Sequence, residues 1–486
     1  MKKTKSITVN FIMNTILTMS SFIFPLITFP YVSRILLPEG TGKVSFVTSV
    51  VSYFAMFAQL GIPVYGIRAC ARVRDDRREL SRTVQELFLI NLIMSILVCM
   101  VLYMAVIYIP RLNNEKSLFI VISLLILFNA IGMEWLYKAL EQYTYITIRS
   151  MLFKLVAVIA MFFLVREPKD YVRYGAITIF ASSASNILNF CNVRNYIDIS
   201  PSGPYRLRRH VKAISVFFAM SCASTIYTNL DAVMLGFMKS DIDVGYYNAA
   251  VKIKGILLGL VTSLGTVLLP RVSYYIENGL KDKFHDIAAK AINFVFLIAV
   301  PLCVYFVLFA KESIYFLSGK AYEGSIVPMQ IIMPTLIFIG LTNIMGIQML
   351  VPMGKEKYVL YSEIAGAVVD LFLNVLMIPL FAAAGAAMGT LVAEIVVWIV
   401  QFYFLKNDIK NIFIRRSYVY VVVAAAISVL ISFWVKWMGW SSFITMAISA
   451  CLYFGGYILL LSLVKDPLIF EIKKKVCTIY HRIVIR

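Results

Sequence analysis

The chain has 486 residues, of which 60% are hydrophobic and only 15% are charged. A soluble domain of this size cannot hide so much apolar surface, because it still needs a polar exterior. The composition therefore argues against a soluble enzyme, a nucleic-acid binder or a disordered scaffold, and predicts an all-α integral membrane protein.

Apolar runs recur along the whole chain, and most are near the roughly 20 residues that cross a bilayer as a helix. Only helices satisfy every backbone amide of such runs inside a bilayer, and the alternating pattern of a membrane barrel is absent. The fourteen expected transmembrane helices fall at 8–32, 44–66, 84–109, 118–138, 148–165, 172–193, 213–238, 244–270, 291–310, 326–352, 359–379, 386–405, 418–436 and 443–464.

The formal net charge is +20, from 46 Lys and Arg against 26 Asp and Glu. With the N-terminus inside, 32 of the basic residues fall in inside loops and 10 in outside loops. Basic loops stay in the cytoplasm, so this ratio predicts that both termini are cytoplasmic. The same asymmetry explains most of the positive charge, and we expect no nucleic-acid partner.

An internal repeat is suggested by an offset of 203 residues, which places Gly42 on Gly245 and Arg68 on Arg271. Together with matching helix lengths, this offset predicts two six-helix lobes, as in many transporters built from repeats. The tail 465–486 mixes Lys and Arg with apolar residues and predicts an amphipathic helix on an anionic membrane surface. The predicted domains are an N-terminal lobe at 1–212 (helices 1–6), a C-terminal lobe at 213–406 (helices 7–12), and 407–486 with helices 13–14 and the basic tail.

Basic residues within or at the ends of the spans are candidates for a functional cavity, since a charge there costs several kcal/mol. Lys252 and Lys254 lie two residues apart on a helix and point to different faces, so at least one is expected to face a wet cavity. Snorkelling to the interface is the alternative, and it is as good an explanation for Lys154. The candidate substrate-binding cations are Arg34, Arg68, Lys154, Lys252, Lys254 and Arg271.

The three arginines among these candidates can also be explained without a role in substrate binding. Arg68 and Arg271 fit the orientation rule as inside-loop markers. Arg34 lies on the outer side, where that rule predicts no arginine, and its alternatives are a helix cap or a lipid headgroup contact.

Acidic residues within the spans suggest ion coupling or charge pairing. For Asp231 the alternatives are an ion or proton site and a salt bridge to Lys252 or Lys254. Glu134 is expected to pair with Lys138 at i+4. The acidic candidates for ion coupling or pairing are Asp231, Asp370, Glu363 and Glu394.

Several classes of site have no signature in the sequence. The seven cysteines and three histidines are scattered, which predicts neither disulfides nor a metal site. No GxxxxGK[ST] motif is present, so we expect no ATP hydrolysis. A membrane glycosyltransferase or polymerase would need a large outside loop with catalytic groups, and the longest, at about 311–325, is too short. We therefore expect a protein that is not an enzyme.

Seven phrases of the sequence carry a family likeness: FPYVSRILLPEGTGKVSF, SYFAMFAQLGIPVYGIR, RVRDDRRELS, GMEWLYKALEQYTYITIRS, NLDAVMLGFM, VGYYNAAVKIK and SLGTVLLPRVSYY. They resemble the bacterial polysaccharide-biosynthesis flippases, which are O-antigen or capsule repeat-unit translocases of the multidrug/oligosaccharidyl-lipid/polysaccharide exporter superfamily. The match is dense from residue 8 to about 275 and looser beyond. Lys138 replaces an uncharged residue of the family pattern, so no role is carried over to that position.

The resemblance implies a two-lobed, fourteen-helix transporter of the bacterial cytoplasmic membrane that works by alternating access. Its cargo would be an undecaprenyl-diphosphate-linked oligosaccharide. The family's cationic central cavity fits Arg68, Lys252, Lys254 and Arg271. The resemblance implies no bound cofactor but leaves room for coupling to an H⁺ or Na⁺ gradient. The implied partners are membrane lipids, a polysaccharide polymerase and a chain-length regulator. The alternative is a cation-coupled multidrug exporter, or an exporter of another lipid-linked substrate, of the same superfamily.

Overall fold

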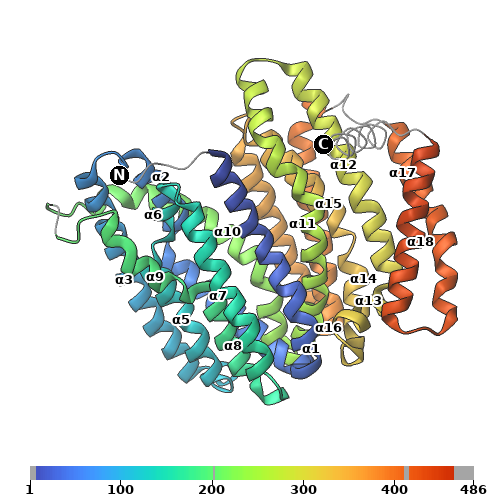
Figure 1. The fold of residues 1–486 in the computed structure, drawn as a ribbon, viewed down its shortest axis with the longest axis horizontal. Coiled ribbons are helices and arrows are strands. Elements are labelled where there is room, and N and C mark those ends of the chain that lie inside the picture. Colours follow the sequence, from blue (N-terminus) through green and yellow to red (C-terminus); the bar gives the residue numbers. More distant parts are fainter. Residues whose placement is uncertain (1–6, 201–202, 410–414, 465–486) are drawn as a thin grey trace, which may run out of the picture. The chain divides into compact units, whose positions relative to one another are not determined.

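The computed structural model describes residues 7–200, 203–409 and 415–464, and every regular element among them is helical (Figure 1). The predicted amphipathic tail 465–486 lies outside the described residues. The chain divides into two compact units, Met1–Asn248 and Ala249–Arg486. The three-part division at 212 and 406 refers to sequence repeats and stays a prediction.

In the first unit, α1 packs against α3, α5, α7, α8 and α10. The α1 helix is therefore the centre of this unit. The helices are α1 (Ile7–Gln59), α2 (Ile62–Arg72), α3 (Arg77–Tyr108), α4 (Pro110–Asn113), α5 (Lys116–Gly132), α6 (Glu134–Ala139), α7 (Tyr143–Leu164), η1 (Pro168–Asp170), α8 (Tyr171–Ile179), η2 (Phe180–Ala184), α9 (Asn186–Asn192), η3 (Val193–Asn195) and α10 (Arg208–Met238).

The α11 helix (Asp241–Glu277) begins in the first unit and continues into the second. In the second unit α12 packs against α15 and α17, and α17 runs beside α18 (Figure 1). The remaining helices are α12 (Lys281–Leu308), α13 (Ala310–Leu317), η4 (Lys320–Ser325), α14 (Ile326–Ile332), α15 (Thr335–Thr342), η5 (Asn343–Leu350), α16 (Glu356–Ile409), α17 (Arg415–Ser432), η6 (Phe433–Met438) and α18 (Ser442–Leu463).

Large apolar side chains are exposed along many of these helices, among them Met104, Phe163 and Phe372. So much exposed apolar surface is typical of a protein whose surroundings are acyl chains rather than water. Among the described residues, eight helices are long and apolar enough to cross a membrane, or nine if Lys320–Ile332 and Thr335–Leu350, bent by 47°, form one span. All fourteen predicted segments are helical here, but fourteen crossings with both termini inside stay a prediction.

Two of the longest helices each contain two predicted segments and a sharp break between them. The α1 helix breaks at Leu37, which has φ 59° and ψ 177°. Pro38 follows, and the residue before a proline is disfavoured in the helical conformation. The α16 helix breaks at Ala382, with φ 48°. These breaks let two consecutive predicted segments follow one another without a loop.

The connector between η3 and α10 is fastened to the first turns of α3. The backbone N–H of Asp198 donates to Ser81 Oγ at 2.9 Å, and Gln85 Nε2 donates to the carbonyl oxygens of Asp198 and Ser200 at 2.7 and 3.0 Å. Arg77 also forms an ion pair with Asp198 at 2.9 Å. The chain that leads from the first predicted lobe to the second is therefore held by specific hydrogen bonds.

At the centre of this attachment is Glu86 on α3, whose side chain is fully buried. Its carboxylate accepts from the backbone N–H of Arg206 at 2.7 Å and from Arg209 Nε at 2.8 Å. His210 Nε2 lies 2.8 Å from the same carboxylate, and its Nδ1 lies 2.8 Å from the hydroxyl of Tyr65. A buried carboxylate is tolerated only with such partners, so Glu86 ties the start of α10 to α3.

Candidate functional site

The first unit contains a cavity of about 370 Å³ between α1, α6, α7 and the α8–η2 segment. Its lining is partly apolar and partly charged or hydroxyl-bearing. Two of the contributing helices, α1 and α7, are long and apolar enough to cross a membrane. The lining residues are Leu17, Ser21, Phe24, Pro25, Glu134, Ile146, Arg149, Ser150, Lys154, Thr178, Ala181, Ser182 and Ser185.

Local backbone irregularities position two walls of this cavity. Residues Phe180–Ala184 form a π-helical turn, a wider turn that frees backbone groups and is frequent at functional sites. On another wall, α5 ends at Gly132, and Met133 adopts a left-handed conformation with φ 42°. The chain restarts as α6 at Glu134, which brings this carboxylate to the cavity.

Arg149 on α7 is the most deeply buried charge of the cavity, with 3% of its side chain exposed. One terminal nitrogen donates to the carbonyl oxygen of Ser185 at 2.8 Å and to Asn186 Oδ1 at 3.2 Å. The other lies 3.4 Å from Glu134 Oε2. Among the described residues, no acceptor meets its Nε. A buried donor without a partner is costly, so an oxyanion entering the cavity would find a donor already in place.

Lys154 lies further along α7 and is half-buried. Its Nζ donates to Ser20 Oγ at 2.8 Å and to Ser21 Oγ at 3.2 Å, both on α1. Snorkelling would carry the ammonium group to an interface, but here it is held by hydroxyl groups of the neighbouring helix. These hydroxyls are neutral, so they bring no negative charge to Lys154.

Glu134 stands between two cations. Its Oε1 lies 2.8 Å from Lys138 Nζ, which confirms the predicted i+4 pair, and its Oε2 lies 3.4 Å from Arg149. Because Lys138 shares this carboxylate, Glu134 does not neutralise both Arg149 and Lys154. The cavity therefore has an excess of positive charge and a lining rich in hydroxyl groups, which suits a phosphate-bearing or sugar-bearing ligand.

The other predicted cations have varied surroundings. Arg34 is exposed, and its guanidinium donates to the carbonyl oxygen of Pro30, one turn earlier on α1, at 2.7 Å. Arg68 on α2 is exposed. Lys252 and Lys254 are half-buried on α11. The backbone of Arg271 lies in α11, but its side chain lies outside the described part of the structure. A cavity shared by all six predicted cations stays a prediction.

The predicted acidic residues are mostly buried. Asp231 on α10 is 5% exposed and accepts a hydrogen bond from the hydroxyl of Tyr247. Asp370 and Glu394 on α16 are buried, and Glu363 is half-buried. Asp370 faces the later half of the same helix, because a side chain at Gly389 would place its first carbon 2.9 Å from Asp370 Oδ1. Their roles in ion coupling stay predictions.

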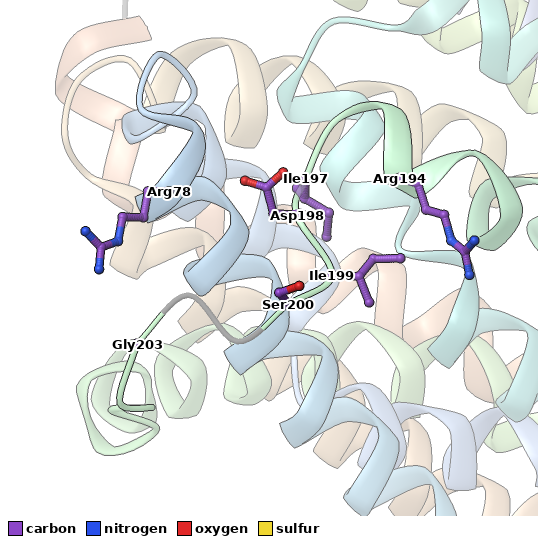
Figure 2. A pocket seen from close by; sticks show the side chains of 7 residues that line it. All are labelled: Arg78, Arg194, Ile197, Asp198, Ile199, Ser200 and Gly203. Carbon is purple, nitrogen blue, oxygen red and sulfur yellow. The ribbon is translucent and has the colours of Figure 1, made fainter.

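A second, larger hollow of about 970 Å³ opens on the surface beside the connector. Figure 2 shows that the side chains of Arg78 and Arg194 extend away from one another on opposite sides of it. Asp198, which pairs with Arg77, adds a carboxylate to the lining. With its cations turned apart, this hollow is a weaker candidate for an anion site than the cavity around Arg149. Its lining consists of Arg78, Arg194, Ile197, Asp198, Ile199, Ser200 and Gly203.

Arg149 lies at the start of the predicted helix 148–165 and was not among the predicted site residues. The lining residues Ser21, Ser182 and Ser185 interrupt apolar runs, as does Ser20, which bonds to Lys154. These hydroxyls are the signal that could have indicated a polar cavity at Lys154. No group of three or more His, Cys, Asp or Glu that could hold a metal ion occurs in the described part of the chain.

Comparison with protein-family models gives two matches. The model described as "Polysaccharide biosynthesis protein" matches residues 7–276, and the model named MatE matches residues 217–376. A "Putative O-antigen transporter" of Escherichia coli K12 is 24% identical over 392 residues, covering 80% of this chain and 94% of that protein. A protein of the same description from Shigella dysenteriae is 25% identical over 388 residues, covering 78% and 94%.

Two solved structures with a similar fold are those of transporters. The structure described as "Lipid II flippase MurJ, inward closed conformation" superimposes with a TM-score of 0.73 at 14% identity, over 94% of this chain and all of that one. An inward-facing multidrug resistance MATE family transporter gives a TM-score of 0.62 at 14% identity, over 83% and 98%. At these identities the likeness concerns the fold alone.

Proposed function

Since the chain belongs to the polysaccharide biosynthesis protein family, we propose that it is a flippase for lipid-linked oligosaccharides. Its cargo is an undecaprenyl-diphosphate-linked repeat unit of a surface polysaccharide, such as O-antigen, capsule or exopolysaccharide. It moves this cargo across the bacterial cytoplasmic membrane by alternating access. The names of its relatives and its fold likeness to a lipid II flippase support this proposal.

The observation that carries the proposal is the positively charged cavity around Arg149 and Lys154. A diphosphate cannot cross acyl chains unless cations and hydrogen-bond donors replace its water. The guanidinium of Arg149 offers a planar donor set for phosphate oxygens, and Lys154 offers a mobile point charge. The serine and threonine hydroxyls beside them can bind further phosphate or sugar oxygens.

The remaining predicted residues enter the proposal in two groups. Arg34, Arg68, Lys252, Lys254 and Arg271 would guide or hold the diphosphate along its path. Asp231, Asp370, Glu363 and Glu394 would couple the return step to an H⁺ or Na⁺ gradient, because a buried acid can exchange a proton or bind a cation. No bound cofactor is proposed. A polysaccharide polymerase and a chain-length regulator are the proposed protein partners, and membrane lipids surround the chain.

The competing function is export of drugs or of another lipid-linked substrate, which the MatE match and the MATE fold likeness favour. Most such drugs are cations, and the excess positive charge around Arg149 and Lys154 opposes their binding. A strain that lacks this protein should therefore lose surface polysaccharide without becoming sensitive to cationic drugs. Drug sensitivity with normal polysaccharide would favour the competing function.

The direct test replaces Arg149 or Lys154 by methionine in the host and compares surface polysaccharide on gels. Either substitution should reduce export at least about tenfold, because each removes a charge-assisted contact with the diphosphate. Arg166→Met is the matched control, since that arginine is exposed and outside the cavity. Immunoblots of membranes check that each variant is present. Normal export by both cavity variants would contradict the proposal.

A further inference from the structure

Glu134 is the one carboxylate among the described residues that line the cavity. A fixed negative charge beside Arg149 would repel an anionic ligand and lower its affinity. Its presence in a cavity that otherwise suits anions needs a physical reason. The geometry around Glu134 gives this reason, because its carboxylate has two cationic partners at different distances.

The partner outside the cavity is the closer one. Glu134 Oε1 lies 2.8 Å from Lys138 Nζ, whereas Oε2 lies 3.4 Å from the nearest nitrogen of Arg149. A distance of 3.4 Å is at the long end for a hydrogen bond. The side chains of Glu134 and Lys138 are 36% and 35% exposed, whereas that of Arg149 is 3% exposed. Glu134 can therefore leave Arg149 while it keeps a partner and access to water.

Arg149 has more donors than Glu134 satisfies. Two contacts go to the carbonyl oxygen of Ser185 and the side chain of Asn186, which fix the guanidinium in place. The Nε meets no acceptor among the described residues. A diphosphate has several charged oxygens. It can therefore accept from this Nε and also from the terminal nitrogen of Arg149 that lies 3.4 Å from Glu134.

We propose that Glu134 is a displaceable counter-ion of the cavity. Glu134 pairs with Arg149 while the cavity is empty. When the diphosphate of the lipid-linked cargo binds Arg149, Glu134 leaves this arginine and stays paired with Lys138. This inference rests on the proposed function. A transporter must bind its cargo well enough to capture it and weakly enough to release it. A carboxylate that competes with the cargo sets this balance and restores the empty state after release.

The inference makes opposite predictions for two neighbours. Glu134→Gln removes the competing charge and should tighten binding of undecaprenyl diphosphate about tenfold. Lys138→Met removes the second ion-pair partner of Glu134, so Glu134 remains paired with Arg149. This variant should bind undecaprenyl diphosphate about threefold or more weakly. In the double variant, the effect of Lys138→Met should disappear, because Lys138 acts only through Glu134.

The test measures binding of undecaprenyl diphosphate to the purified full-length protein by native mass spectrometry, with undecaprenol as the uncharged probe. Glu141→Gln is the matched control, because Glu141 pairs with Arg74 at 3.0 Å and does not line the cavity. Melting temperatures identify any variant that is misfolded. Glu134→Asp, which keeps the charge, should bind within about twofold of the wild-type chain and covers the case in which Glu134→Gln does not fold.

The outcomes separate the inference from the function on which it rests. Tighter binding by Glu134→Gln together with weaker binding by Arg149→Met supports both. Unchanged or weaker binding by a folded Glu134→Gln, with Arg149→Met impaired, overturns the counter-ion role and leaves the flippase proposal standing. Wild-type binding by Arg149→Met and Lys154→Met overturns the cavity as the diphosphate site, and the counter-ion role with it.

Discussion

Gly42 and Gly245 make reciprocal contacts with the backbone of each other's segment. A side-chain carbon on Gly42 would lie 1.7 Å from the carbonyl oxygen of Asp241, and one on Gly245 would lie 2.0 Å from the carbonyl oxygen of Pro38. The offset of 203 that aligns the two glycines also aligns Pro38 with Asp241. In each segment the glycine approaches the carbonyl oxygen at the equivalent position of the other segment. Such a reciprocal contact is expected where a two-fold axis relates two copies. The internal repeat itself stays a prediction.

Gly42→Ala and Gly245→Ala should each destabilise the protein by about 1–3 kcal/mol, because the new methyl group meets backbone that cannot rotate away. The measurement is the melting temperature of the purified variants in detergent. Gly455→Ala is the control, because nothing lies within 4 Å of its added carbon, and alanine is a better helix former than glycine. Unchanged melting of both glycine variants would show that the two segments are not in contact.

Arg111 strengthens the same region and should not be replaceable by lysine. Its Nε donates to the carbonyl oxygen of Gly236 at 2.7 Å, another nitrogen pairs with Asp241, and its guanidinium lies 4.4 Å from the ring centre of Phe46. Lysine has one point charge and cannot make these three contacts together. We expect Arg111→Lys to lower the melting temperature nearly as much as Arg111→Met. Full stability of the lysine variant would show that charge alone matters here.

Glu86→Gln should loosen the connector, because it leaves Arg209 and His210 without their carboxylate. Breaking a buried ion pair from one side costs about 3–5 kcal/mol. The measurement is limited trypsin digestion, which should cut the variant faster after Arg206 or Arg209. Glu79→Gln is the matched control, because Glu79 pairs with Arg209 at 3.6 Å from an exposed position and should contribute little. Equal cleavage of both variants would contradict a central role for Glu86.

The backbone amides of the loop before α8 should lose their protection from hydrogen exchange in acid. The backbone N–H groups of Arg166 and Glu167, with Arg173, lower the pKa of Asp170 below its usual 3.8. A lowered pKa in the folded state means that this carboxylate stabilises the loop above pH 3.8 and that the contribution is lost as the pH falls below it. Hydrogen exchange of this loop should therefore rise below about pH 4 in the wild-type chain. In the Asp170→Asn variant, hydrogen exchange of this loop should be high at every pH. The same pH dependence in the variant and the wild-type chain would refute a stabilising role for Asp170.

The helices could be predicted from the sequence because a bilayer leaves an apolar run few alternatives. All fourteen expected segments are helical, and the Glu134–Lys138 pair follows from helical spacing. The contact of Arg149 with the carbonyl oxygen of Ser185 was not predictable, since a backbone carbonyl carries no residue signature. The attachment of Glu86 was also missed, because its partners lie about 120 residues further along the chain.

The connector also decides where the protein can be altered for experimental use. Epitope tags and fluorescent proteins are commonly inserted between the halves of a transporter, where a long loop is expected. Here an insertion at 197–200 would separate the chain from Ser81 and Gln85 and release the start of α10. The turn at Gly439, with open space around its α-carbon, is the better insertion point. A reporter placed there would follow the protein without detaching α10 from α3.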